Sequence, residues 1–260
     1  MKQLGFLGMG NMASAIAGGL IQRGVLPPQQ VAAYDIMQDK LKETARHYGF
    51  RPCATAEELA AECDALLVAV KPYYVEGALA PLLPLLEGKV LLSVAAGWDF
   101  ARYEALLPPS VRHLSIMPNT PALVGEGVLL LEERHSLTDE EFEQVKQWFG
   151  ALGQVHVLAS DLMDIGGTVS SCSPAFFALA VEAMADAGVM YGLPRPVAYA
   201  LVSQAMAGTG KMLLETGMHP GALKDMVCSP RGTTIRGVAA LEEKGLRTAL
   251  LSAVERVMDR

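Results

Sequence analysis

The chain has 260 residues, of which 51% are hydrophobic and 19% charged, and this composition excludes an intrinsically disordered protein. Lysine and arginine together number 21, whereas aspartate and glutamate number 28, so the net charge is −7 at pH 7. An acidic chain without a basic cluster binds nucleic acids and anionic membranes poorly, and we expect neither as a partner. The length is sufficient for one large domain or two modest ones.

The four cysteines form no C-x-x-C pair and the five histidines no H-x-x-x-H pair, so we expect neither a disulfide framework nor a metal site. No apolar run approaches the ~18–20 residues of a membrane span. Glycines interrupt the apolar stretch over residues 4–21, which argues against a secretory signal. We therefore expect a soluble, cytoplasmic protein.

Short apolar runs alternate with helical patterns over the first 159 residues. Continuous apolar strands that are separated by helices are typical of a parallel sheet with both faces covered. Residues 1–159 are therefore predicted to form a dinucleotide-binding α/β domain of the Rossmann type, with a doubly wound, mostly parallel sheet. The predicted strands cover residues 4–7, 31–34, 65–70, 90–94, 113–117 and 154–158, and the predicted helices cover residues 12–23, 39–48 and 138–149.

From residue 160 onward the patterns are helical only. Pro174 suits the first turn of a helix over residues 174–191, and further helices are predicted over 194–215 and from about residues 220, 234 and 246. These helices carry too many apolar positions for a one-sided core, which is typical of a dimer interface. Residues 160–260 are therefore predicted to be an all-helical dimerisation and substrate domain.

A glycine-rich turn follows the first predicted strand and opens the first predicted helix. In this G-x-G-x-x-A pattern the first glycine permits a tight turn, and the second lets the backbone approach a pyrophosphate. The third small residue lets the helix pack on the strand, and the helix N-terminus then faces the phosphates. The pattern predicts a nicotinamide dinucleotide site at Gly8, Met9, Gly10, Asn11, Met12 and Ala13.

Asp35 ends the second predicted strand, 22 residues after Ala13. A carboxylate there accepts hydrogen bonds from the adenosine ribose and repels a 2′-phosphate, which favours NADH over NADPH. Lys40 and Lys42 lie close enough in sequence to neutralise such a phosphate. The choice between NADH and NADPH therefore stays open, with Asp35 favouring NADH.

Two further loops follow predicted strands of the same sheet. Ligands of open α/β sheets gather at the carboxyl ends of the strands, so these loops are expected to border the nicotinamide. An amide side chain in the second loop could bind the nicotinamide carboxamide. The candidate residues are Val70, Lys71 and Pro72 in the first loop and Asn119 in the second.

A third polar segment opens a helix of the predicted second domain. Residues 228–234 read Cys-Ser-Pro-Arg-Gly-Thr-Thr and offer hydroxyl groups, backbone N–H groups and one guanidinium. Such a set suits a small carboxylate, although a threonine here could equally serve as a simple helix cap. The residues alone thus predict a nicotinamide-dependent oxidoreductase of a small acid.

From its first residue to its last, the chain resembles the pyrroline-5-carboxylate reductase family. The most specific block covers residues 219–234, with the pattern His-Pro-x-x-Leu-Lys-Asp-x-Val-x-Ser-Pro-x-Gly-Thr-Thr. Weaker matches cover residues 6–13, 69–72, 117–121, 170–177, 192–195 and 241–243. The resemblance implies reduction of 1-pyrroline-5-carboxylate to L-proline by NAD(P)H, the last step of proline biosynthesis.

The resemblance also implies roles and an assembly. It places the substrate at Ser229, Gly232, Thr233 and Thr234, with Thr234 as the catalytic side chain beside the imine. It implies a homodimer of interlaced helical domains, often assembled further into a decamer of five dimers. No histidine or carboxylate is evident as a general acid, so the proton is expected to come from solvent.

The chain departs from the family where Arg231 replaces a glycine, and where Ser171 and Ser173 stand at positions that are often glycine. Arg231 leaves open a non-catalytic, nucleotide-binding paralogue. A reductase of a related six-membered cyclic imine acid is also open, because one methylene gives little discrimination. A 3-hydroxyacid dehydrogenase is disfavoured, because residues 174–191 lack the lysine that such enzymes use.

Overall fold

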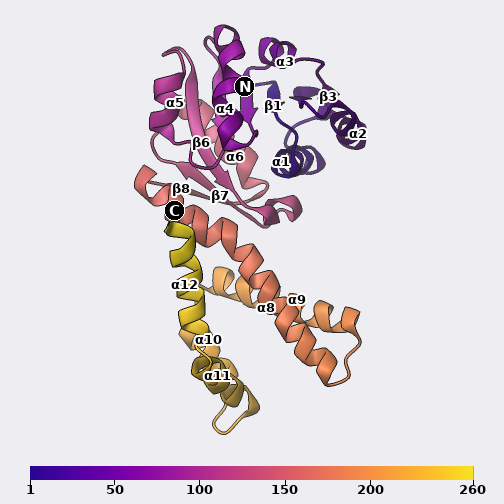
Figure 1. Ribbon diagram of the computed structural model, residues 1–260, viewed down its shortest axis with the longest axis vertical. Coiled ribbons are helices and arrows are strands. Elements are labelled where there is room, and N and C mark those ends of the chain that lie inside the picture. The colour runs from indigo at the N-terminus through magenta and orange to yellow at the C-terminus, as the bar shows by residue number, and fades with distance from the viewer. Residues whose placement is uncertain (260) are drawn as a thin grey trace. The chain divides into compact units, whose positions relative to one another are not determined.

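The computed structural model describes residues 1–259, which form two compact units (Figure 1). The first unit is Met1–Ser171 and the second begins at Cys172. The boundary predicted at 159/160 precedes this division, because residues 160–171 pack with the first unit. The domain boundary at 159/160 therefore stays a prediction.

The first unit contains an eight-stranded sheet in the order β3-β2-β1-β4-β5-β6-β7-β8. Strands β1 to β6 pair in parallel, as do β7 and β8, whereas β6 and β7 pair antiparallel. The mostly parallel, doubly wound sheet is confirmed. The strands are Leu4–Leu7 (β1), Val31–Tyr34 (β2), Arg51–Pro52 (β3), Ala65–Val68 (β4), Val90–Ser93 (β5), Arg112–Pro118 (β6), Gly127–Glu132 (β7) and Gly153–Leu158 (β8).

Helices connect these strands and make up the second unit. In the first unit they are Asn11–Gln22 (α1), Gln38–Tyr48 (α2), Ala56–Glu62 (α3), Val75–Leu79 (α4), Phe100–Leu106 (α5), Asp139–Gly150 (α6) and Met163–Gly167 (α7). In the second unit they are Ser173–Met190 (α8), Arg195–Thr216 (α9), Pro220–Val227 (α10), Thr233–Glu243 (α11) and Leu246–Met258 (α12). The predicted capping box at the start of α6 is present, with Thr138 and Glu141 in reciprocal hydrogen bonds.

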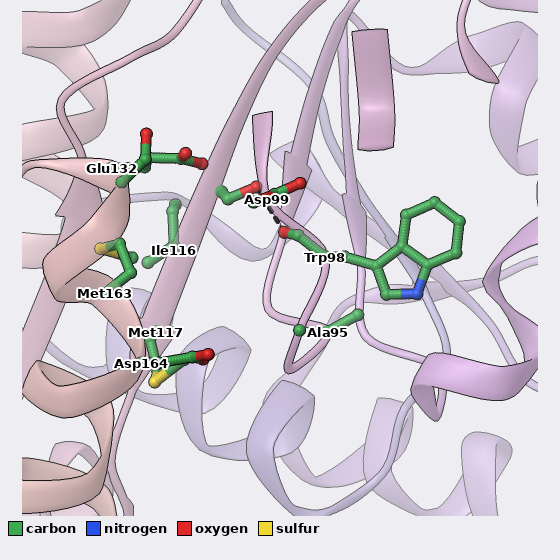
Figure 2. Close-up of a pocket in the computed structure, with 11 residues that line it drawn as sticks. Ala95, Trp98, Asp99, Ile116, Met117, Glu132, Met163 and Asp164 are labelled. Carbon is green, nitrogen blue, oxygen red and sulfur yellow. Dashed lines mark hydrogen bonds between the residues drawn. The ribbon is translucent and has the colours of Figure 1, made fainter. Parts of the chain in front are cut away.

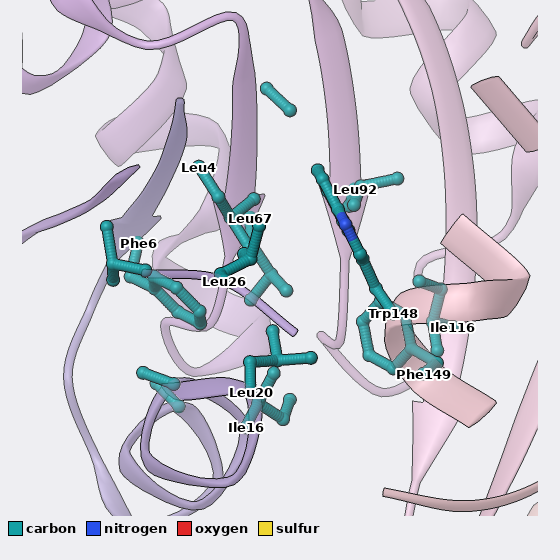
Figure 3. Packing of buried hydrophobic residues seen from close by; sticks show 14 of the residues in the cluster. Leu4, Phe6, Ile16, Leu20, Leu26, Leu67, Leu92, Ile116, Trp148 and Phe149 are labelled. Carbon is teal, nitrogen blue, oxygen red and sulfur yellow. The ribbon is translucent and has the colours of Figure 1, made fainter. Parts of the chain in front are cut away.

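Helices cover both faces of the sheet. Alternate residues of a strand point to opposite faces, and β4 accordingly sends Leu67 into one apolar cluster and Leu66 into another. The first cluster joins the sheet to α1, α2 and α6, with Trp148 and Phe149 among its largest members (Figure 3). The second joins it to α3, α4 and α5. The sheet is therefore held rigidly from both sides.

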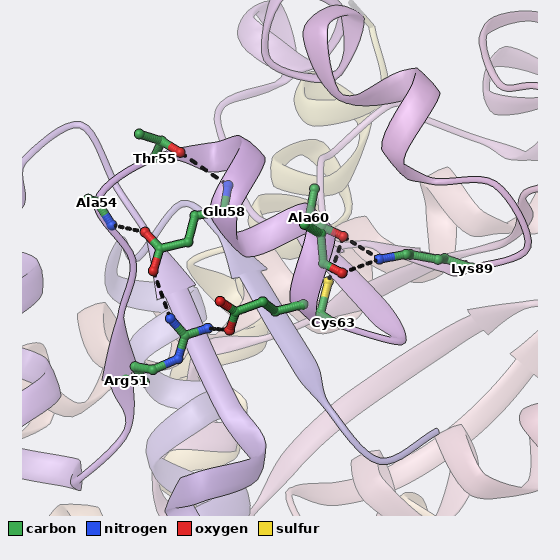
Figure 4. A network of polar contacts seen from close by, with 9 residues as sticks. Arg51, Ala54, Thr55, Glu58, Ala60, Cys63 and Lys89 are labelled. Carbon is green, nitrogen blue, oxygen red and sulfur yellow. Dashed lines mark hydrogen bonds and ion pairs between the residues drawn. The ribbon is translucent and has the colours of Figure 1, made fainter.

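A polar network fixes α3 beside the edge of the sheet (Figure 4). The Glu58 N–H donates to the Thr55 hydroxyl at 3.1 Å and caps the helix, while the Glu58 carboxylate pairs with Arg51 at 2.9 Å. The hydrogen bond from Ala54 N–H, followed by the contacts with Arg51, holds the pKa of Glu58 below its ordinary value. Cys63 lies at the other end of α3, where burial raises the pKa of its thiol to about 11, so this cysteine is unreactive at neutral pH.

The second unit buries very little of its own apolar surface. Among its described residues, 172–259, only Ala185, Ala198 and Leu223 are buried. Large apolar side chains of α8 and α9 are more than half exposed, including Phe177, Leu179, Leu201 and Leu214. A helical unit of this kind needs a further surface to cover it.

One helical stretch, Ser160–Met190, is long and apolar enough to cross a membrane by length and composition alone. This differs from the expectation from sequence, because the helix continues through glycines and serines that break the apolar run. Only 6% of its most apolar window is buried, so it is not an ordinary core helix. One such helix is weak evidence for a membrane span, and an oligomer interface accounts for the same exposed apolar surface.

Gly153 starts β8 with φ 150°, and a Cβ there would lie 2.0 Å from the backbone oxygen of Gly127, its partner in β7. We expect Gly153→Ala to lower the free energy of unfolding of the first unit by about 3 kcal/mol or more, because backbone cannot move aside cheaply. Both tryptophans, Trp98 and Trp148, lie in this unit, so tryptophan fluorescence during urea unfolding measures the effect.

Gly88→Ala is the matched control. Gly88 also has a positive φ, 71°, but no atom lies within 4 Å of an added Cβ, so only the backbone strain of about 1 kcal/mol is expected. Equal effects of the two substitutions would contradict the close approach of β7 and β8.

Candidate active site

The turn between β1 and α1 has the geometry that its glycines predict. Gly8 has φ 94°, and a Cβ there would lie 3.0 Å from the Ala69 carbonyl oxygen. Gly10 is the N-cap of α1, no side chain caps this helix, and nothing lies within 4 Å of where its Cβ would be. Met9 and Ala13 are buried, whereas Asn11 and Met12 form the first turn of α1. The first N–H groups of α1 are therefore available to an anion.

This turn lies where the chain changes direction across the sheet. Strand β1 pairs with β2 on one side and with β4 on the other. The chain therefore adds β2 and β3 on one side of β1, and then crosses back to add β4 on the other side. Such a switch point leaves a crevice at the carboxyl ends of the strands, where nucleotides bind in open α/β sheets.

The side chain of Asp35 braces the glycine-rich turn. One carboxylate oxygen accepts a hydrogen bond from Met9 N–H at 2.7 Å, and the other accepts one from Met37 N–H at 2.8 Å. The carboxylate thus ties the end of β1 to the end of β2. Sequence spacing predicted a contact of Asp35 with a ribose, but gave no sign of this contact with the protein's own backbone.

The indole of Trp98, which is not among the site residues predicted from the sequence, binds the loop after β4. Trp98 donates its ring N–H to the Pro72 carbonyl at 3.0 Å, and Ser115 Oγ donates to the Trp98 carbonyl at 2.7 Å. Val70 and Pro72 are half-buried, whereas Lys71 is exposed. Trp98 follows β5, so strand-end reasoning applied to β5 as well would have found it.

Asn119 lies at the end of β6, is 5% exposed and uses its amide within the first unit. Its nitrogen donates to the Ser170 carbonyl at 2.9 Å, and its oxygen accepts from Val128 N–H at 2.8 Å. The side chain therefore joins β6, β7 and the π-helical turn Thr168–Cys172. Only its second N–H remains for a ligand.

A cavity of about 110 Å³ opens beside the ends of β5 and β6 (Figure 2). Trp98, Asp99, Met117 and Asp164 line it, together with Glu132. One oxygen of the buried Glu132 carboxylate accepts from Phe100 N–H at 2.8 Å, and the other has no partner within residues 1–259. The unpartnered oxygen thus belongs to a residue that lines this cavity.

In the second unit, Ser229, Gly232, Thr233 and Thr234 lie together at the start of α11. Gly232 N–H donates to the Ser229 carbonyl at 2.9 Å, and Gly232 is the N-cap of α11 without any capping side chain. Thr233 and Thr234 are the first two residues of this 11-residue helix and are exposed. The alternative, that one of these threonines caps the helix, therefore does not describe the structure.

Arg231 precedes this cap with φ 62° and is the single non-glycine residue with positive φ among residues 1–259. A side chain in this region destabilises the backbone by about 1 kcal/mol. Arg231 stands where the family resemblance places a glycine, and the backbone at this position is left-handed.

The structure thus brings Gly8–Ala13, Asp35, Val70–Pro72 and Asn119 to the carboxyl ends of neighbouring strands of one sheet. It brings Ser229 and Gly232–Thr234 to one helix start in the other unit. The set in the first unit offers an uncapped helix N-terminus for a pyrophosphate. The set in the second unit offers hydroxyl and N–H groups for a small anion.

Comparison with known families gives a match in each unit. The family model for pyrroline-5-carboxylate reductase dimerisation matches residues 160–260, and that for NADP oxidoreductase, coenzyme F420-dependent, matches residues 3–97. These matches support a nicotinamide cofactor for the first unit and homo-oligomerisation through the helical one.

Relatives that match the chain over its full length include pyrroline-5-carboxylate reductases. The chain is 42% identical to the pyrroline-5-carboxylate reductase of Treponema pallidum, over 96% of this chain and 97% of that protein. It is 40% identical to that of Escherichia coli, over 100% and 97%. The crystal structure of Plasmodium falciparum pyrroline carboxylate reductase with NADP bound aligns with a TM-score of 0.89 at 30% identity, covering 98% of this chain and 95% of that one.

Asp35→Asn tests the brace on the glycine-rich turn. An asparagine has one oxygen and cannot accept from both Met9 and Met37, so the turn loses its fixed geometry. We expect the dissociation constants of NADH and NADPH both to rise, by about tenfold for NADH, in fluorescence titrations. A change confined to the ratio of the two constants, with NADPH simply gaining affinity, would contradict the brace and leave only an effect on the 2′-phosphate.

Proposed function

Because this chain belongs to the pyrroline-5-carboxylate reductase family and reduces 1-pyrroline-5-carboxylate to L-proline with a nicotinamide cofactor, we propose how its residues share that work. Gly8–Ala13 bind the pyrophosphate, and Val70–Pro72 and Asn119 border the nicotinamide. The observation that carries this assignment is the uncapped N-terminus of α1 at the switch point of the sheet.

The substrate lies at the start of α11 in this proposal. Its carboxylate accepts hydrogen bonds from Ser229 and from the N–H groups of Gly232 and Thr233, and Thr234 Oγ orients the ring nitrogen. When bound, the reduced nicotinamide supplies the hydride for the imine carbon. Residues 228–234 contain no histidine or carboxylate, so the proton on nitrogen comes from solvent and the loop contributes positioning and electrostatics.

For the cofactor we propose a preference for NADH over NADPH. Asp35 places a negative charge at the end of β2, where a 2′-phosphate of NADPH would be repelled. The bonds to Met9 and Met37 hold the carboxylate in place, and each oxygen keeps a second lone pair for a ribose hydroxyl. Lys40 and Lys42, the two charges that could offset this repulsion, are exposed on α2, and neither makes an ion pair among residues 1–259.

For the assembly we propose a homodimer through α8 to α12, with five dimers forming a decamer as the family resemblance implies. The exposed apolar side chains of α8 and α9 support the dimer. We also propose a cytoplasmic location, supported by four free cysteines.

Steady-state oxidation of NADH and NADPH in the presence of 1-pyrroline-5-carboxylate tests the roles. We expect turnover with both cofactors and a higher kcat/KM for NADH. Thr234→Ala is expected to lower kcat by about 10- to 100-fold, because the ring nitrogen loses its oriented hydrogen bond. Thr234→Ser retains the hydroxyl and is expected to keep most of the activity.

Unchanged turnover in Thr234→Ala would remove Thr234 from the reaction. Equal losses in Thr234→Ala and Thr234→Ser would indicate that the methyl group, and not the hydroxyl, is what matters. A higher kcat/KM for NADPH would overturn the proposed preference without affecting the substrate site.

Leu179→Glu tests the interface. Leu179 on α8 is 66% exposed in the single chain, and a carboxylate there would be buried against the partner. We expect dissociation to monomers in light scattering after size-exclusion chromatography. Leu123→Glu is the control, since Leu123 is 57% exposed in the first unit. An intact oligomer in Leu179→Glu, or dissociation in both variants, would argue against the interface.

A further inference from the structure

Arg231 holds a backbone conformation that favours glycine. Its φ of 62° lies in the left-handed region, and every other described residue with positive φ is a glycine. The protein therefore keeps an unfavourable conformation at one position where glycine would relieve it. Backbone strain of this kind clusters at active sites and ligand-binding loops.

The Arg231 guanidinium has no use within its own chain. It makes no hydrogen bond or ion pair among residues 1–259, whereas Arg195 and Arg247 of the same unit pair with Asp186 and Glu242. The side chain is exposed. Five N–H donors and one full positive charge thus remain available to a ligand.

The surroundings of Arg231 point to an anion. It is followed at once by Gly232, the N-cap of α11, and no side chain satisfies the first N–H groups of that helix. A Cβ on Gly232 would lie 3.0 Å from the Ser229 carbonyl oxygen, which also accepts a hydrogen bond from Gly232 N–H at 2.9 Å, so the backbone turn is tight. The substrate carries a carboxylate, while the chain as a whole carries a net charge of −7 that repels it.

We propose that Arg231 is a specificity-determining residue that binds the substrate carboxylate through its guanidinium. Guanidinium and carboxylate match in a planar, charge-assisted pair, which would reinforce the helix N–H groups. This inference rests on the proposed placement of the substrate at residues 229–234. It adds a charged side chain to a site otherwise made of hydroxyl and backbone groups.

The backbone strain of Arg231 lowers stability, whereas its charge is expected to strengthen substrate binding. Three substitutions separate these two effects. Arg231→Gly removes both, so the melting temperature is expected to rise by about 1–3 °C while the KM for 1-pyrroline-5-carboxylate rises about tenfold. Arg231→Ala keeps the strain and loses the charge, so only KM rises. Arg231→Lys keeps the charge without the planar fork and is expected to raise KM by a smaller factor.

The experiment measures kcat and KM for 1-pyrroline-5-carboxylate and for NADH, the inhibition constant of L-proline, and the melting temperature by circular dichroism. L-Proline carries the same carboxylate, so its inhibition constant is expected to rise by the factor seen in KM, while kcat and the KM for NADH stay within about twofold. Arg46→Ala is the matched control. Arg46 is an exposed arginine in the last turn of α2, at the opposite end of that helix from Asp35. The KM of the Arg46→Ala variant for 1-pyrroline-5-carboxylate is expected to stay unchanged.

Unchanged KM and L-proline inhibition in both Arg231→Gly and Arg231→Ala would overturn the inference. An equal rise in KM for NADH would also overturn it, because the guanidinium would then act on the cofactor. Ser229→Ala and Thr234→Ala, measured alongside, separate two failures. If they impair the reaction and the Arg231 variants do not, only the role of Arg231 is wrong. If none has an effect, the placement of the substrate at residues 229–234 is wrong.

Discussion

The first unit depends on bringing the ends of β1 and β2 together around one carboxylate. Parallel strands end at the same edge, so the turn after β1 must leave the sheet in very little space, and Gly8 meets that need with φ 94°. Asp35 then accepts a hydrogen bond from Met9 N–H at 2.7 Å and fixes the turn to the end of β2. The turn leads directly into α1, whose N-cap is Gly10 and whose first N–H groups no side chain caps.

The neighbouring loops are fixed by the same kind of contact, side chain to backbone. Trp98 binds the Pro72 carbonyl, and Asn119 binds Val128 N–H and the Ser170 carbonyl. Each bond spans segments that are distant in sequence. The cofactor-facing edge is thus stiffened by groups that do not themselves need to touch a ligand, which is what an enzyme requires if its reacting atoms are to meet in one geometry.

The sequence was informative where a periodic pattern has a single physical meaning. The apolar runs of β1, β4 and β5, the capping box at Thr138 and the proline at the start of α8 each predict one local structure. The run in β7, Gly127–Glu132, was missed, because a short leucine-rich segment suits a buried helix as well as a strand. Its antiparallel pairing with β6 is supported by Asn119, a tertiary contact that leaves no periodic trace.

The residues of the functional site likewise fall into those that the sequence predicts and those that it does not. The glycine-rich turn was predictable from its position between strand and helix, and residues 229–234 from their polar composition. The brace formed by Asp35 was not, because spacing gives the place of a carboxylate but not its partner. The left-handed backbone of Arg231 could be anticipated only as a question, since an arginine taken by itself favours negative φ.

The helical unit has a consequence for how the protein is made. With three buried residues among positions 172–259, this unit gains little free energy from folding by itself, and most of its stabilisation must come from a second chain. Its folding is therefore a bimolecular event whose extent depends on protein concentration. The N-terminal unit, with a core of its own, can fold as soon as it leaves the ribosome. We therefore expect each newly made chain to acquire its nucleotide fold first and to complete its helical half on meeting another.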